Sequence, residues 1–290
     1  MANLKELRNR ISSVSSTMQI TNAMKMVSAS KLSKAQEAIE AMRPYADKLT
    51  ELLQSLSASS DGAESKFADK REPKNILVVA VSSNRGLAGA FNSNIVKRVK
   101  KLITEDFAAY NTEVLTIGKK ANDVLKKDFP IVENNTEIFD KMKFDEVAQI
   151  AEDIMTSFVD GEYDKVVFVY NKFVNAAVQM VTTEQFLPIV PKEKDQKEAQ
   201  KANEVDYIFE PQKEKIIQEL IPKSLKIQLF KALRDSVASE HGARMTAMHK
   251  ATDNATELRD DLNLKYNKAR QAAITNEILE IVGGAEALNG

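Results

Sequence analysis

The chain has 290 residues, of which 43% are hydrophobic and 29% are charged, so it can bury a core and disorder is not expected. Its 41 basic and 42 acidic side chains give a net charge of −1, which argues against nucleic acid and against an anionic membrane surface as partners. The absence of cysteine excludes a disulfide framework and a thiol nucleophile. No apolar run approaches the roughly 20 residues that cross a bilayer, so no membrane span is expected.

The first segment predicts a long coiled-coil helix over residues 1–60. An apolar seam with alternating spacings of three and four residues runs from Leu4 to Leu56. The seam fails between Thr21 and Ser28, where apolar side chains occupy the neighbouring positions instead. This stretch either turns a different face toward a partner or buries a broad apolar face in its own domain. Pro44 predicts a kink or a short interruption.

The middle of the chain predicts an α/β domain over residues 76–210, which follows a polar linker at residues 61–75. Strands are expected at residues 76–81, 113–117, 131–132, 165–170 and 178–186, and helices at residues 92–110, 119–127 and 144–159. Such alternation favours a mainly parallel, Rossmann-like sheet flanked by helices. A charged connector at residues 191–205 precedes a candidate last strand at residues 207–209.

The last segment, residues 211–290, predicts the second coiled-coil helix. Pro211 and Pro222 are expected to bound a short helix, so that the long helix begins near Lys223. The seam of the long helix is clearest at Met248, Ala251, Ala255, Leu258, Leu262, Lys265, Ala269 and Ala272. Alanine at seam positions lets two helix axes approach closely, which suits a two-stranded rod.

The two long helices are expected to pair with each other as an antiparallel coiled coil. This pairing is expected to bring residues near Leu4 close to residues near Ile278. Gly283 and Gly284 predict the end of the second helix. The first 35 residues carry an excess of basic side chains, which favours an acidic partner surface, although a chance bias on a solvated face is the alternative.

Candidate chemistry is sparse. The turn at residues 82–92 lies between a strand and a helix, where backbone N–H groups can hold a phosphate. Its glycines, Gly86 and Gly89, match neither GxGxxG nor GxxxxGK[ST], so we interpret it as a structural turn. His241 and His249 lie at i and i+8, too far apart to share a metal on one helix. The sequence therefore predicts no catalytic residue, no metal and no cofactor.

Several strings of residues carry a family resemblance. They are LKELRNRI at 4–11, QITNAMKMV at 19–27, NRGL at 84–87, ASEHGARMTAM at 238–248, ATDNA at 251–255 and YNKARQAAITNEI at 266–278. These strings closely resemble the gamma subunit family of the rotary ATP synthase, and the resemblance extends over essentially the whole chain. The sequence departs from that family's commonest pattern at Asn84, where aspartate is frequent, and at Ala88, where cysteine is frequent.

The resemblance implies a central, non-catalytic rotor shaft. In that family the paired helices turn inside a ring of alpha and beta subunits, and the α/β domain is a foot on the epsilon subunit and the membrane c-ring. Ion-driven rotation then drives ATP synthesis by the beta subunits, at the cytoplasmic face of the cell membrane. Two rival interpretations remain: an α/β nucleotide-binding enzyme with a coiled-coil arm, which would need a competent phosphate loop, and a passive coiled-coil scaffold, which should show uniform heptads.

The resemblance also implies which residues contact partners. Two match contacts with the acidic lever loop of the beta subunits, Met24 and Arg244, and Lys25 is expected to be a partner contact as well. Four match a polar catch near the top of the ring: Arg270, Gln271, Thr275 and Glu277. Five are expected in an apolar sleeve that acts as a bearing: Ile274, Ile278, Leu279, Ile281 and Val282. Two match the foot contact: Tyr207 and Glu210.

Overall fold

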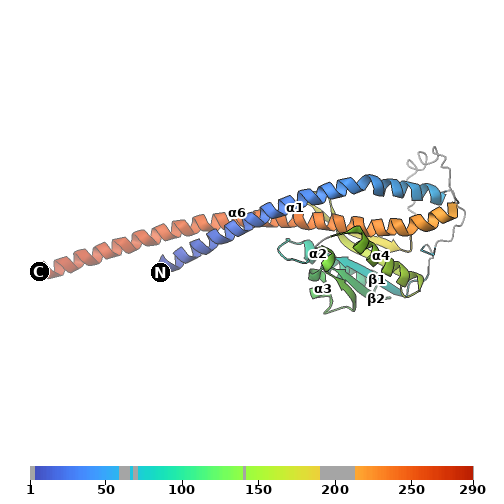
Figure 1. Ribbon diagram of the computed structural model, residues 1–290. Helices are drawn as coiled ribbons and strands as arrows, with labels where there is room; N and C mark the ends of the chain where they lie inside the picture. The colour runs from blue at the N-terminus through green and yellow to red at the C-terminus, as the bar shows by residue number, and fades with distance from the viewer. Residues whose placement is uncertain (1–3, 59–65, 68–70, 140–141, 190–212, 290) are drawn as a thin grey trace. The chain divides into compact units, whose positions relative to one another are not determined.

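The computed structural model describes residues 4–58, 66–67, 71–139, 142–189 and 213–289 (Figure 1). The chain divides into two compact units by the contacts between its residues. The terminal unit consists of Met1–Ser28 together with Arg244–Gly290, and the central unit consists of Ala29–Ala243. Each of the two longest helices, α1 (Leu4–Ala58) and α6 (Lys213–Asn289), contributes residues to both units.

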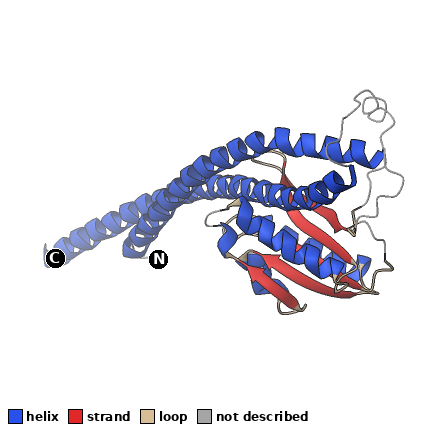
Figure 2. Cartoon of the chain, turned by 45° about the vertical axis from the view of Figure 1, so that its right-hand side comes forward, coloured by secondary structure: helices blue, strands red, loops and turns tan. Residues whose placement is uncertain are grey.

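The central unit contains one five-stranded sheet in the order β3-β2-β1-β4-β5 (Figure 2). The strands are β1 (Asn75–Val81), β2 (Asn111–Ile117), β3 (Ile131–Asn135), β4 (Lys165–Phe173) and β5 (Gln179–Leu187). All neighbouring pairs are parallel except β4 and β5, which are antiparallel. The predicted Rossmann-like sheet is confirmed, and its first strand is buried on both faces as a continuous apolar run predicts.

Helices cover both faces of this sheet. Alternate residues of β1 pack on α2 (Phe91–Lys101) and α3 (Lys119–Leu125) on one face, and on α4 (Phe144–Val159) and residues 225–233 of α6 on the other. The helix expected over residues 92–110 ends earlier, in a π-helical turn at Leu102–Asp106. The backbone N–H of Phe107 closes that turn on the carbonyl of Leu102 at 2.8 Å, because the Phe107 ring is buried in the core. A short 3-10 turn at Glu137–Phe139 precedes α4.

Three expected breaks in the long helices are absent from the described residues. Helix α1 is continuous through Pro44, which lies on an exposed face where water can satisfy the carbonyl four residues earlier. Helix α6 begins at Lys213 and passes through Pro222, so the separate short helix is wrong. It also passes through Gly283 and Gly284, since a glycine in a helix interior costs only about 1 kcal/mol relative to alanine.

Some expectations fall on residues that the structure does not describe. The connector at residues 191–205, the candidate strand at 207–209, and the foot residues Tyr207 and Glu210 lie outside the described residues. Most of the linker expected at residues 61–75 does as well. Within the described residues of the central unit, α1 and α6 already pack together through Ala46, Leu49 and Ile227.

Candidate functional site

The terminal unit is an antiparallel pair of helices. The Arg8 guanidinium on α1 donates to the Tyr266 hydroxyl on α6 at 3.0 Å, and the hydroxyls of Thr21 and Thr252 lie 2.8 Å apart. A higher number on α1 therefore faces a lower number on α6, which confirms the antiparallel coiled coil. The position that faces Leu4 is accordingly close to Arg270, so the expectation that Leu4 meets Ile278 is wrong by about two helical turns.

The predicted seam of α1 is confirmed in this unit. Leu7 and Ser28 are buried, and the seam positions between them are all half-buried. Where the apolar seam fails, Thr21 and Ser28 still face inward, whereas Met26 and Val27 are exposed. The interpretation that their broad apolar face is buried in its own domain is therefore wrong. This stretch of α1 displays apolar side chains outward.

The predicted seam of α6 is correct at only some positions. Met248, Ala255 and Leu262 are buried as expected. Leu258 is 49% exposed, and Lys265 and Ala272 are exposed as well, so these three assignments are wrong. The seam passes instead through half-buried polar side chains, which are Thr252, Thr256, Arg259 and Tyr266. A search for apolar residues at coiled-coil spacing misses them, because each gains its place through a polar contact with α1.

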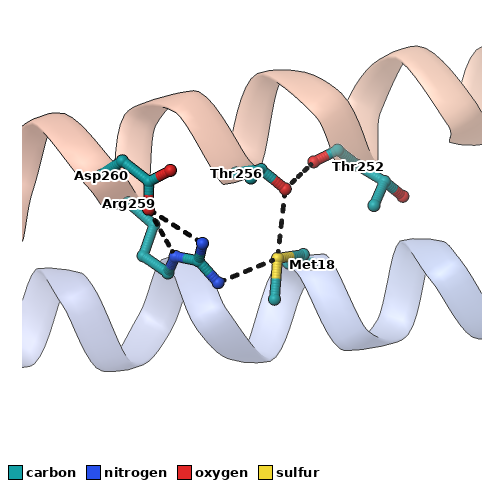
Figure 3. A network of polar contacts seen from close by, with 5 residues as sticks. All are labelled: Met18, Thr252, Thr256, Arg259 and Asp260. Atoms are coloured by element: carbon teal, nitrogen blue, oxygen red, sulfur yellow. Dashed lines mark hydrogen bonds and ion pairs between the residues drawn. The ribbon is translucent and has the colours of Figure 1, made fainter.

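Figure 3 shows the central group of these contacts, around Met18 of α1. The Thr256 hydroxyl lies 3.3 Å from the Met18 sulfur, and the Arg259 Nη1 lies 3.7 Å from the same sulfur. A second nitrogen of Arg259, Nη2, donates to Asp260 at 2.8 Å, which fixes the guanidinium on its own helix. A thioether sulfur is a weak hydrogen-bond acceptor, so the two contacts with Met18 contribute little binding energy. They set the position of one helix relative to the other.

The Arg8 and Tyr266 pair is a further polar contact between the two helices, near the start of α1. The guanidinium carbon also lies 5.9 Å from the centre of the Tyr266 ring, within the range of a cation–π interaction. The hydrogen bond to the Tyr266 hydroxyl raises the pKa of the Arg8 guanidinium above its ordinary value. Arg8 therefore remains a cation at any pH at which the protein is folded.

Beyond this pairing, α6 continues as a single helix past the start of α1 (Figure 1). Every residue from Ile274 to Ala285 is exposed. The exposed apolar side chains of this tail are Ile274, Ile278, Leu279, Ile281 and Val282. Within the described part of the chain nothing covers them. Such a concentration of apolar surface is typical of a site that a partner buries.

The expected contact residues fall into three environments. The residues of the polar catch, Arg270, Gln271, Thr275 and Glu277, are all exposed on α6. Met24 and Lys25 are half-buried on α1. Arg244 retains only 8% of its surface, so it is much less accessible than the others. Thr21 faces Thr252, so Met24 faces His249, and Arg244 lies more than one helical turn farther along α6.

The turn at residues 82–92 is closed by contacts within the protein. Ser83 donates from its backbone N–H to the Asn92 side-chain oxygen at 3.0 Å and from its hydroxyl to the carbonyl of Arg85 at 2.7 Å. Asn84 donates from its amide to the carbonyl of Thr136 at 2.7 Å. A carboxylate at position 84 has no proton for that bond, so asparagine gives this turn an additional anchor. These contacts support the interpretation as a structural turn.

The remaining candidates for chemistry carry no site. His249 lies 3.4 Å from Asp253 on the same helix, as a surface pair that is charged only when the histidine is protonated. In the part of the chain that the structure describes, no group of three or more potential ligands is placed to hold a metal ion. The same residues include no helix whose length and apolar character would suffice to traverse a bilayer.

Known proteins match this chain along its whole length. The family model described as ATP synthase matches residues 3–288. The ATP synthase gamma chain of Christiangramia forsetii is 67% identical over 291 residues, and the alignment covers 100% of both chains. The ATP synthase gamma chain of Trichlorobacter lovleyi is 44% identical over 291 residues, with the same coverage.

Solved structures match as well. One is a chain of the cryo-EM structure of the Tetrahymena thermophila mitochondrial ATP synthase central stalk and c-ring, with 29% identity and a TM-score of 0.59. The match covers 80% of this chain and 99% of that chain. Another is a chain of the rotor of the Euglena gracilis mitochondrial ATP synthase, at 20% identity and a TM-score of 0.67, with 93% and 98% covered. At 20% identity, the match to the Euglena gracilis rotor is evidence for the fold only.

Proposed function

Because the chain belongs to the family of ATP synthase gamma chains, it is the central rotor shaft of that complex, and we propose which of its surfaces couple rotation to catalysis. The shaft links ion-driven rotation of the membrane c-ring to conformational cycling of the catalytic beta subunits. Its partners are the alpha and beta subunits, the epsilon subunit and the c-ring. The chain is not itself the catalyst.

The single observation that carries the proposal is the change along α6 from a paired helix to a lone one. In the paired section the helix has a partner within its own chain, whereas the apolar tail from Ile274 onward has none among the described residues. A ring of partner subunits around the tail supplies the missing cover. The side chains Ile278, Leu279, Ile281 and Val282 then act as an apolar bearing that turns without polar contacts to break.

The polar catch lies at the base of this tail. Arg270, Gln271, Thr275 and Glu277 are exposed there, and the Thr275 hydroxyl is held by the carbonyl of Gln271 at 2.9 Å. Charge-assisted hydrogen bonds are directional, so a partner loop that engages these side chains does so at particular rotor angles. The catch therefore distinguishes the three positions around the ring, whereas the bearing does not.

The lever contact lies on α1. Met24 and Lys25 present a soft apolar side chain beside a cation, and the exposed Met26 and Val27 extend the apolar surface outward. Such a surface is complementary to an acidic lever with apolar neighbours. At each rotor angle the surface contacts one conformation of a beta subunit more favourably than the others, so rotation shifts the beta subunits between conformations. Arg244, which is nearly buried, supports this region from α6. Tyr207 and Glu210 carry the foot contact with the epsilon subunit and the c-ring.

The location of the shaft follows from its partners. It is a peripheral component of the complex, held at the membrane through the c-ring. In a bacterial cell membrane this places the protein on the cytoplasmic face, where ATP is made. Two experiments test this statement. The protein should sediment with the membranes of broken cells, and in intact cells it should be protected from protease added outside.

The lever contact is tested by Met24→Lys, with Met24→Leu as the matched control. The new cation strengthens binding to an acidic lever and slows its release, so coupling between ion flow and ATP synthesis falls. The half-buried position also tolerates lysine, because its aliphatic stem can remain at the seam while the charge reaches water. The measurement is ATP made per ion translocated in reconstituted vesicles. Met24→Lys complexes that couple as well as the Met24→Leu control would refute the contact.

A further inference from the structure

The polar contacts across the paired helices of the terminal unit have a mechanical role. We infer that the contacts Arg8–Tyr266, Met18 with Thr256 and Arg259, and Thr21–Thr252 are shear keys, which stop α1 and α6 from sliding along each other when the shaft carries torque. The inference rests on the proposed rotor function, since only a loaded shaft needs such keys. It assigns a positioning role to polar side chains that contact each other across the helix pair.

The apolar part of the seam is poorly suited to resist sliding. The buried apolar side chains of the terminal unit are Leu7, Met248, Ala255 and Leu262. Hydrophobic contact is non-directional and depends on the area buried. Small side chains such as Ala255 protrude little from the helix surface. The two helices can therefore shift along each other with little loss of buried apolar area. The apolar seam holds the helices together without fixing where along their axes they meet.

The polar contacts depend sharply on axial position. The hydroxyls of Thr21 and Thr252 are 2.8 Å apart, and a slide by one helical turn moves the helices by about 5.4 Å, well beyond hydrogen-bonding distance. A slide by a whole heptad does not restore the contacts. It places Arg8 opposite Arg259 in one direction, with like charges together, and opposite Ala273 in the other, with no acceptor.

The middle key is braced on α6. Arg259 donates through Nε and Nη2 to Asp260 at 3.0 and 2.8 Å, so its guanidinium is held before it reaches Met18 (Figure 3). The Thr256 hydroxyl is likewise within 2.9 Å of the Thr252 carbonyl on its own helix. A side chain that is already fixed transmits a displacement of one helix directly to the other. Two of the keys, at Met18 and Thr21, lie within one helical turn of α1, and the third, at Arg8, lies about three turns away.

Torque on a two-stranded rod requires such constraints. A partner that loads one helix alone, such as a lever on α1 or a sleeve on α6, passes that load to the other helix through the contacts between them, so directional contacts there limit sliding. The single-helix tail of α6 has no neighbouring strand and needs no keys.

The test removes two of the three keys, Arg8–Tyr266 and Thr21–Thr252, with little change in side-chain volume. The variant Thr21→Val/Thr252→Val/Tyr266→Phe keeps the side-chain shapes and the aromatic ring but deletes the hydroxyls. The matched control is Ser16→Ala/Thr17→Val, because these exposed hydroxyls bond to carbonyls of their own helix, each at 3.0 Å. Both variants are assembled into the complete complex, and the torsional stiffness of the shaft is measured from the angular fluctuations of a bead attached to the rotor.

The key variant should lose torsional stiffness relative to the control, while its thermal unfolding temperature stays the same or rises, because valine pairs are apolar. A purely stabilising role predicts the opposite, a lower unfolding temperature with unchanged stiffness. Equal stiffness in both variants would overturn the inference. If the complexes do not rotate at all, even with the unaltered chain, the rotor function itself fails, which is a separate outcome.

Discussion

Replacing the two apolar side chains Ile278 and Ile281 by alanine should weaken the grip of the ring on the shaft without changing the fold. These side chains are 54% and 71% exposed in the chain. Complete burial of an isoleucine contributes roughly 1.5 to 3 kcal/mol, so covering the exposed portion in a partner sleeve contributes about 1 kcal/mol for each. The double variant should therefore lose about 2 kcal/mol of binding, which is roughly a 30-fold increase in Kd.

The assay is titration of immobilised alpha–beta rings that lack a rotor, with the unaltered chain and the Ile278→Ala/Ile281→Ala variant. The control is Val132→Ala, an apolar side chain with 53% exposure on β3 of the central unit, which should bind with an unchanged Kd. Thermal unfolding of the isolated chains should be the same for all three proteins, because no described residue buries these positions. A Kd within twofold of the unaltered chain would refute the bearing.

Two further predictions concern the central unit. Gly118→Ala should lower its free energy of unfolding by roughly 3 to 5 kcal/mol, as measured by chemical unfolding. The reason is that φ is +108° and an added Cβ would lie 2.2 Å from the Ser82 carbonyl oxygen. The control Gly86→Ala should be nearly neutral, because its Cβ would meet only the flexible end of the Lys120 side chain at 3.8 Å. Burial raises the pKa of Asp235 despite its cationic neighbours, so its contribution to stability is full below the unfolded carboxyl pKa and is lost as pH rises through the raised value. The Asp235→Asn variant should not lose stability over this pH range. If the free energy of unfolding changes with pH in the same way for the variant and the unaltered chain, the prediction is wrong.

Much of the architecture follows from local patterns in the sequence. Continuous apolar runs such as residues 76–81 predict buried parallel strands, and the helix expected at residues 144–159 has these same bounds in the structure. The α1 seam was predictable because its apolar residues are large and their spacing is regular. The family resemblance added the partners, which spacing alone does not identify.

Other features depend on information that a local pattern does not contain. Pro44, Gly283 and Gly284 are local helix-breaking signals, yet a long helix absorbs each of them at a cost of a few kcal/mol or less. The polar positions of the α6 seam escaped prediction because Arg259 and Tyr266 are polar, and their partners Met18 and Arg8 are more than 200 residues away. The axial register follows from those partners, so it was misplaced by about two turns.

The terminal helices depart from an ordinary amphipathic pair in two places, because part of the seam is polar and the tail is apolar. The seam contains Thr21, Thr252 and Arg259, while the tail exposes Ile278 and Ile281. Apolar residues at the seam and polar ones on the tail would make the isolated chain more stable. The observed arrangement is favourable only if the tail is buried by partners and the seam carries load. Selection for stability of the free chain therefore explains neither feature, whereas selection for torque transmission inside a ring explains both.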